Sequence, residues 1–213
     1  MLKITHLVLS PAFTNAYLIA DSTTGEAAII DPAWDGHLIL AEAEKLGWNI
    51  RQLWVTHAHF DHIGGVGAIV EGLDPPPRVA LHPADLPLWR AQGGAPFFGL
   101  RLTPAPDPDV ELSPGQVLRL GSYQFEVRHA PGHSLGHVIF YCAAESVLFS
   151  GDVIFQSGIG RTDLPGGDFD TLMESIREQV MSLPDETRIL SGHGPETSVG
   201  QERRENPWVG WGA

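Results

Sequence analysis

Short apolar stretches separated by turn residues recur along the first third of the chain. They either alternate with polar residues or run continuously, which is typical of strands that are half or fully buried. One stretch instead carries its apolar residues at helical spacing and ends before Gly47. We therefore expect strands at residues 4–9, 16–20, 27–30 and 50–55, a helix at 37–45, and a second helix beginning near His62.

The rest of the chain repeats this order of strands followed by a helix. Residues 169–182 predict an amphipathic helix, and residues 93–108 form an insertion rich in glycine and proline. Two runs of strands and helices favour two sheets packed face to face with helices outside, and no linker divides the 213 residues, so we expect a single domain spanning 1–213. Further strands are expected at 78–81, 116–120, 124–129, 137–142, 147–150 and 188–190.

Composition and charge narrow the class of protein. A hydrophobic content of 43% suits a globular domain. The net charge of -13 argues against a nucleic-acid substrate, because a negative field repels the phosphate backbone. We expect no signal peptide and no membrane span. The single cysteine, Cys142, lies in an apolar stretch, where we expect it to be buried and inert; it fits a reducing compartment, so a cytoplasmic protein is expected.

Three histidines and an aspartate directly follow the strand at 50–55. Neutral imidazoles and carboxylates suit borderline cations such as zinc, manganese and iron. His57 and His59, two apart in extended chain, should point the same way, whereas Asp61 and His62 fall where a helix begins and can face a second point. One ion cannot easily take all four side chains, so this block predicts two metals.

Three more residues of metal-binding type each follow a predicted strand and a glycine. They are His133, Asp152 and His193. Loops at strand ends collect functional groups, and a preceding glycine permits the tight backbone path that a crowded metal site needs.

The pattern His-x-His-x-Asp-His, then Gly-His, Gly-Asp and Gly-His, resembles the metallo-β-lactamase superfamily. The resemblance spans roughly residues 57–193 and extends weakly to 14–18 and 30–32. Within the superfamily, segments 151–155, 158–163, 191–197 and 202–207 are similar to the short glyoxalase II-type (hydroxyacylglutathione hydrolase-like) metallohydrolases.

This resemblance implies an α+β fold, a four-layer αββα sandwich with a two-metal site at one edge of its sheets. It implies a first ion held by His57, His59 and His133, a second held by Asp61, His62 and His193, and Asp152 bridging them. Zinc is the expected metal, with iron or manganese as alternatives.

The resemblance also implies a thioesterase that cleaves S-2-hydroxyacylglutathione by attack of a metal-bridging hydroxide, which Asp61 orients. Full-length glyoxalase II enzymes bind glutathione largely through a helical C-terminal extension, whereas twenty residues follow His193 here. Arg203 and Arg204 are the nearest basic residues for that role, with a plain solvated tail as the alternative. Arg161 is either a substrate contact or a structural residue, and the loops at 93–108 and 155–167 are expected to shape the pocket.

Other chemistries on the same scaffold stay open. Persulfide dioxygenases of this superfamily share the Gly-x-Gly-Arg-Thr-Asp stretch at 158–163 and use one iron held by two histidines and an aspartate. Lactonase, β-lactamase and a non-catalytic metal-stabilised binding module rank lower; Cys142 lies outside any metal motif, whereas β-lactamases often use a cysteine ligand.

The remaining histidines and the tail tryptophans have plainer interpretations. We expect His137 to be an ordinary residue at a strand start, with support of the metal site as the alternative. Surface or turn positions are expected for His6, His37, His82 and His129. We expect Trp208 and Trp211 to cover apolar surface, with contact to a partner as the alternative.

Overall fold

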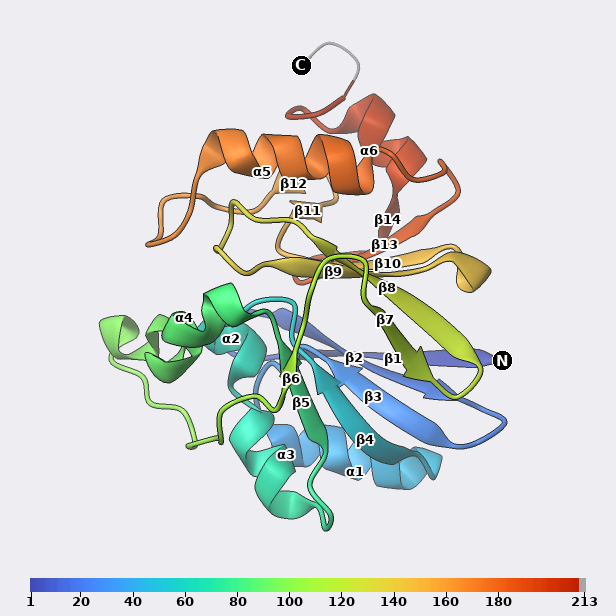
Figure 1. The fold of residues 1–213 in the computed structure, drawn as a ribbon, viewed down its shortest axis with the longest axis vertical. Coiled ribbons are helices and arrows are strands. Elements are labelled where there is room, and N and C mark those ends of the chain that lie inside the picture. The colour runs from blue at the N-terminus through green and yellow to red at the C-terminus, as the bar shows by residue number, and fades with distance from the viewer. Residues whose placement is uncertain (211–213) are drawn as a thin grey trace.

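The chain folds into two six-stranded sheets that face each other, with helices on both outer sides (Figure 1). A computed structural model describes residues 1–210; residues 211–213, and with them the expectation for Trp211, lie outside the described part. The order of layers is helix, sheet, sheet, helix, so the predicted αββα sandwich is confirmed.

The first sheet is built from the N-terminal half of the chain. Its strands lie in the order β1-β2-β3-β4-β5-β6, antiparallel up to β3 and parallel from there. Helices α1 (Gly36–Leu46) and α3 (Val66–Gly72) cover its outer face (Figure 1). The strands are β1 (Leu2–Leu9), β2 (Thr14–Asp21), β3 (Glu26–Ile30), β4 (Asn49–Trp54), β5 (Arg78–Leu81) and β6 (Val110–Glu111).

The second sheet comes from the C-terminal half, in the order β14-β13-β10-β9-β8-β7. Helices α5 (Phe169–Ser175) and α6 (Val199–Glu205) lie on its outer side. Its strands are β7 (Val117–Leu120), β8 (Tyr123–His129), β9 (Val138–Cys142), β10 (Val147–Gly151), β13 (Arg188–Ser191) and β14 (Thr197–Ser198); β11 (Ile154–Phe155) and β12 (Gly158–Ile159) form a separate hairpin.

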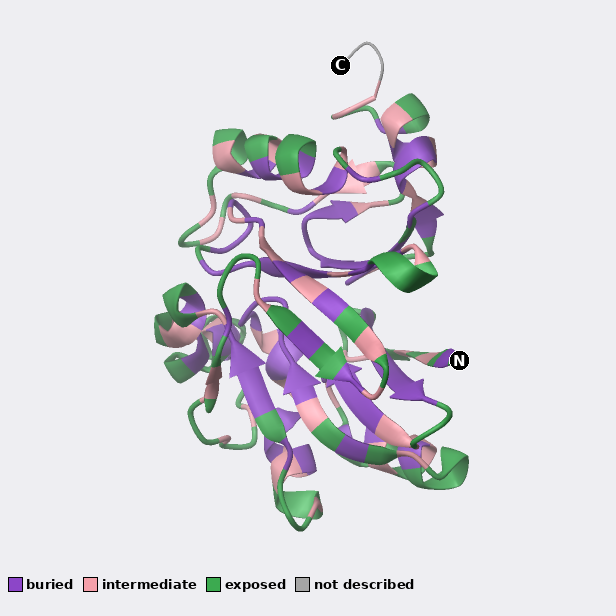
Figure 2. Ribbon diagram, turned by 45° about the vertical axis from the view of Figure 1, so that its right-hand side comes forward, coloured by how far each residue is buried: buried purple, intermediate pink, exposed green. Residues whose placement is uncertain are grey.

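Apolar side chains fill the space between the two sheets. Trp54 of β4 meets Phe125 of β8 with ring centroids 5.0 Å apart, and Phe140 of β9 packs on the same indole ring. Buried residues run along these strands, while α5 shows its outer side to solvent (Figure 2). Cys142 is fully buried in this layer, and burial raises the pKa of its thiol, as expected for an inert cysteine.

Several elements differ from the sequence-based expectation. The helix expected at 169–182 is α-helical only to Ser175 and continues as a π-helical turn, Ile176–Val180. The helix expected near His62 consists of the short α2 (Phe60–Ile63) followed by α3. The chain before the insertion folds into α4 (Leu86–Arg90), and the first part of the insertion folds into a 3-10 segment, Gln92–Phe98.

The tail packs less completely than its aromatic content suggested. Trp208 is 49% exposed, although its ring lies 6.0 Å from that of Phe169 at the start of α5. In the part of the chain that the structure describes, no helix has the length and apolar content needed to cross a bilayer.

Candidate metal centre

The seven side chains that the sequence singled out converge at one edge of the two sheets. The block after β4 belongs to the first sheet, and the other three residues follow β8, β10 and β13 of the second sheet. The cluster therefore lies where loops from both sheets meet. Its members are His57, His59, Asp61, His62, His133, Asp152 and His193.

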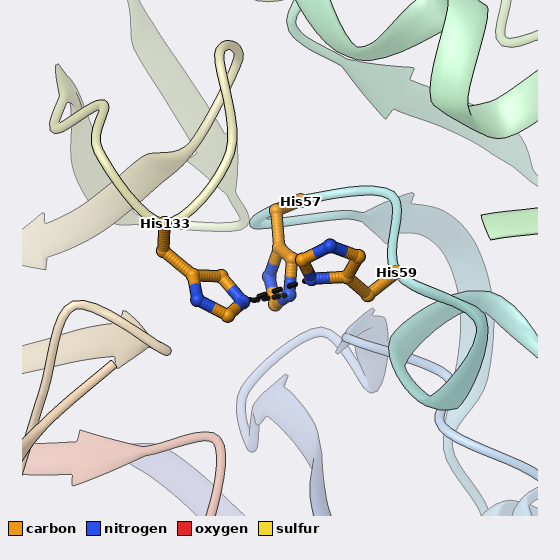
Figure 3. Close-up of side chains that lie close together, drawn as sticks. All are labelled: His57, His59 and His133. Atoms are coloured by element: carbon orange, nitrogen blue, oxygen red, sulfur yellow. Dashed lines mark hydrogen bonds between the residues drawn. The ribbon is translucent and has the colours of Figure 1, made fainter. Parts of the chain in front are cut away.

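Three histidines form the first trio. The Nε2 atom of His133 lies 2.8 Å from Nδ1 of His59 and 3.2 Å from Nε2 of His57 (Figure 3). Burial, followed by the neighbouring imidazoles, holds the pKa of His57 well below its usual range and lowers that of His59 to about 3. Buried, neutral imidazoles that aim ring nitrogens at one point could hold a cation, as the spacing of His57 and His59 predicted.

Asp61, His62 and His193 form the second trio, in which the potential ligand atoms lie within 4.8 Å of one another. Asp152 faces both trios. Its Oδ2 atom lies 3.6 Å from Nε2 of His133 and 3.4 Å from Nε2 of His193. A carboxylate in this place could be shared by two ions.

The charge in the second trio also favours a cation. Burial opposes a charged imidazole, but Asp152, Asp61 and Asp31 hold the pKa of His62 well above its usual range. Burial likewise opposes the charge on His193, yet its hydrogen bonds to Asp152 and Asp61 raise its pKa to about 10. Metal binding would release protons that such a site otherwise retains.

Two buried atoms test whether the residues fit metal. Nε2 of His62 and Oδ1 of Asp152 lie 3.3 Å apart and have no hydrogen-bond partner among the described residues. An unpaired buried polar atom costs about 1–3 kcal/mol, so such atoms need an explanation. A cation between them supplies it, and the donor set therefore fits a two-metal site.

Asp31 fixes the orientation of one imidazole in this cluster. Its Oδ2 atom lies 2.9 Å from Nδ1 of His62, and the same carboxylate accepts hydrogen bonds from the N–H and hydroxyl of Thr56 at 2.7 Å each. The second ring nitrogen of His62 is thereby aimed at the cluster. The sequence had marked this residue only as a flank of the family resemblance.

Asp85 joins the two ligand-bearing loops and escaped sequence reasoning. Its buried carboxylate accepts hydrogen bonds from the N–H of Ala58 (2.9 Å), the hydroxyl of Ser134 (2.8 Å) and the N–H of Gly136 (2.6 Å). Ala58 lies between His57 and His59 in the chain, Ser134 directly follows His133, and Gly136 directly precedes His137. The signal was weak, because a single aspartate after the strand at 78–81 is common in turns.

The expectation for His137 was wrong and its alternative correct. Its Nε2 atom accepts a hydrogen bond from the N–H of Asp152 at 3.0 Å, and its ring stacks on His57 with centroids 4.7 Å apart. Burial, then His133, holds the pKa of His137 well below its usual range, which keeps the imidazole neutral and able to accept. Strand β9 begins one residue later and directs this side chain into the site.

The arginines predicted to bind substrate take different places. Arg161 lines the cavity beside the cluster, and its carbonyl lies 2.8 Å from Nδ1 of His133. Its guanidinium pairs with both carboxylate oxygens of Asp163 at 2.6 and 2.7 Å. Arg161 thus has a structural contact to the site, and its side chain is already paired.

Arg203 and Arg204 lie outside the described cavity lining, and their contact with substrate stays a prediction. Arg203 donates to the carbonyls of Met181 and Leu183 at 2.7 and 3.2 Å and pairs with Asp185, so α6 directs it to the end of the preceding helical segment. Helix-end carbonyls attract such cations. Arg204 is exposed on α6, and neither arginine belongs to the cavity lining found among the described residues.

A cavity of about 820 Å³ opens next to the cluster. Residues of the 3-10 segment Gln92–Phe98 form one part of its wall, and residues 161–166 form another. Both loops expected to shape the pocket, 93–108 and 155–167, therefore contribute to it.

Comparisons with known proteins agree with this geometry. A family model described as the metallo-beta-lactamase superfamily matches residues 9–193. Hydroxyacylglutathione hydrolase GloC of Haemophilus influenzae is 38% identical over 203 residues, covering 92% of each chain. The crystal structure of BLEG-1 B3 metallo-beta-lactamase superposes with a TM-score of 0.90 at 39% identity and covers 98% of this chain and 99% of that one. That of TTHA1623 in a di-iron-bound form gives 0.87 at 41% identity, covering 96% and 100%.

Proposed function

Because the chain belongs to the metallo-beta-lactamase superfamily, we propose that this metal-dependent hydrolase cleaves thioesters, with S-2-hydroxyacylglutathione as the first candidate substrate. The observation that carries the proposal is the complete set of two trios with Asp152 facing both. The relative named as a hydroxyacylglutathione hydrolase supports the substrate class.

We assign the side chains to two ions. His57, His59 and His133 would hold the first, Asp61, His62 and His193 the second, and Asp152 would contact both. Zinc is the first candidate, with iron or manganese as alternatives; one similar protein has been crystallised with two irons. Two such cations, when bound, lower the pKa of bound water to ~7, supply hydroxide at neutral pH and polarise a carbonyl.

The protein's own groups then position the reactants. The Thr14 hydroxyl donates to Oδ2 of Asp61 at 2.9 Å and holds that carboxylate, which we assign to accept a hydrogen bond from the attacking water. The leaving thiol has a pKa of roughly 8.5, so it departs as the thiolate without a general acid. The site consequently needs no further titrating residue for a thioester.

Thiol release from S-lactoylglutathione by metal-reconstituted protein tests this function. We expect release to disappear after metal removal and to fall by about 100-fold or more in Asp61→Ala. Asp107→Ala, which changes an exposed carboxylate, is the matched control and should keep full activity. No release from protein that carries two metals would reject the thioester substrate.

The same experiment separates the dioxygenase alternative. The stretch at 158–163 adjoins the site, since the Arg161 carbonyl contacts His133, and it is the feature shared with persulfide dioxygenases. One bound iron, oxygen consumption with a persulfide and no thiol release would favour that chemistry. Two metals and oxygen-independent release favour the hydrolase, and a β-lactam belongs in the substrate panel because of the similarity to BLEG-1.

A further inference from the structure

The cavity over the cluster has a polar floor and apolar walls. Asp61, His133 and Asp152 contribute to the floor. The apolar lining comes from α4, the 3-10 segment after it and two loops of the second half, and includes Pro87, Leu88, Phe97, Phe98, Leu135 and Leu164.

Building on the proposed thioesterase function, we infer that the preferred substrate is a thioester with an apolar acyl group, aryl or extended alkyl, and that this group lies in the cavity while the thiol part faces solvent. The inference concerns the substrate class of the same site, and it differs from a site built for the small lactoyl group.

The charges of the lining disfavour an ionic substrate part in the cavity. Among the lining residues in the described chain, Arg161 carries the one guanidinium, and it already donates hydrogen bonds to both carboxylate oxygens of Asp163. Apart from Asp61 and Asp152 of the cluster, Asp85 is the one carboxylate of the described lining, and three protein donors already bond it. The glutathione moiety carries two carboxylates, which would find no unpaired guanidinium or ammonium in the described lining and would lose hydration.

The direction of the reaction places the acyl group inside. Hydrolysis releases a thiolate, and a new anion between apolar walls is costly unless water reaches it. The acid product keeps its carboxylate at the floor, beside the cluster. The arrangement with the acyl chain between the walls and the thiol at the mouth is therefore the one that desolvates least charge.

The fold holds apolar side chains at the mouth by an unusual backbone path. Gln92, Gly93 and Gly94 all have positive φ, 55°, 62° and 80°. A Cβ atom at Gly93 would collide with the backbone of Phe60, so glycine lets this turn lie directly on the loop that carries the cluster.

The same turn delivers two phenylalanines to the mouth. The ring of Phe98 lies 5.1 Å from that of Phe60. Phe97 is 87% exposed, and Leu135 on the opposite loop is 60% exposed. Large apolar side chains exposed beside a catalytic site are available to an apolar ligand, which would remove them from water.

A series of acyl groups on one thiol tests the inference. Metal-reconstituted protein is assayed with glutathione thioesters of lactate, 2-hydroxybutyrate, 2-hydroxyhexanoate and mandelate, and with a succinyl thioester as a charged comparison. Burial of each methylene should raise kcat/KM about fourfold, so the hexanoyl and mandeloyl compounds should be preferred over lactoyl and the succinyl compound disfavoured. The same increase of kcat/KM with acyl chain length is expected when N-acetylcysteamine replaces glutathione as the thiol, because the thiol part faces solvent.

The wall is tested by Leu88→Asn, a near-isosteric change, with Leu38→Asn on the exposed face of α1 as the matched control. Leu88→Asn should flatten the chain-length dependence while lactoyl cleavage and metal content persist, and Leu38→Asn should leave the slope unchanged. Phe98→Ala serves as a second wall variant if Leu88→Asn binds less metal.

The outcomes separate the inference from the proposed function. Cleavage of lactoylglutathione with a flat or falling series, or a slope that follows the thiol, would overturn the acyl assignment and leave the thioesterase standing. Cleavage of no thioester at full metal content would overturn the thioesterase and the inference with it.

Discussion

At the scale of single residues, the cluster depends on carboxylates outside the proposed set of metal ligands. Asp31 orients His62 through the 2.9 Å contact to Nδ1 and is itself held by Thr56. A carboxylate behind a histidine ligand fixes the tautomer and raises the basicity of the ring. The residue thus determines where the free nitrogen of His62 points.

Asp31→Asn is predicted to weaken binding of the second metal by about 10- to 100-fold. Oδ1 of Asp31 accepts from the Thr56 N–H, and Oδ2 faces both the Thr56 hydroxyl and His62, so an amide nitrogen in either place leaves at least one of these groups without its acceptor. Titration of the apoprotein with zinc against a competing chelator measures the loss, and Asp107→Asn is the exposed control. Two unaltered binding constants would contradict the role given to Asp31.

Asp85 makes a different prediction, because its partners are backbone and hydroxyl groups of two loops. Asp85→Asn should cost about 1–3 kcal/mol of unfolding free energy, since its amide nitrogen faces at least one donor. Urea unfolding of the metal-free proteins measures this without contribution from bound ions, with Asp107→Asn as control. A midpoint equal to that of the unchanged chain would show that Asp85 does not hold the loops together.

The difference between these residues shows what a sequence can predict of a site. His57 and His59 were identifiable because dense histidines after a strand are unusual, and His133 because a glycine and a strand precede it. No comparable sequence pattern identifies Asp85. Its role depends on hydrogen bonds from Ala58 and Gly136, which are distant in the sequence and come close to it only in the folded chain.

At the scale of elements, predictability follows the source of each element's stability. β5 was predicted within its exact bounds because its apolar run itself determines burial on the sheet. The two-residue strands β6 and β14 were missed. They form because they pair with β5 and β13, and their own sequences show no strand pattern. The π-helical turn after α5 was equally invisible, since its residues keep ordinary helical periodicity.

The end of β2 is joined to the second sheet through residues that lie outside the metal cluster. Asp21 at the end of β2 accepts hydrogen bonds from the N–H and hydroxyl of Ser122, at 2.9 and 2.8 Å, in the turn between β7 and β8. These bonds, the backbone one first, and the N–H of Thr23 hold the pKa of Asp21 well below its usual range. The first sheet is thereby tied to the second.

The lowered pKa of Asp21 gives a pH dependence with a definite sign. Its contribution to stability is fully present above the unfolded-state pKa of about 3.9 and is lost as pH falls below it toward the folded-state value. Asp21→Asn should therefore be less stable than the unchanged chain at about pH 7, with a difference that shrinks below about pH 4. Urea midpoints of both metal-free proteins test this, and a difference that is constant with pH would contradict it.

At the scale of the whole molecule, the two sheets meet through an apolar interior and are joined by polar contacts. The loop after β4 of the first sheet and the loops after β8, β10 and β13 of the second reach the cluster. Bound cations would therefore cross-link the two halves of the fold as well as supply chemistry.

Metal removal is accordingly predicted to destabilise the whole fold. A ligand at 100 times its Kd stabilises the native state by about 2.7 kcal/mol, which corresponds to roughly 5–10 °C in Tm for a chain of this size. Removal of the metals by a chelator should therefore lower Tm by roughly 5–10 °C, and added zinc should restore it.

Amide hydrogen exchange locates the effect within the fold. Exchange should become faster mainly in the loops around residues 57–62, 132–136 and 192–194, because these lose the cross-link, while the turn at Ser122 keeps its bonds to Asp21. An unchanged Tm in protein shown to have lost both ions would mean that the buried carboxylates and imidazoles satisfy one another, and that the cluster cross-links nothing.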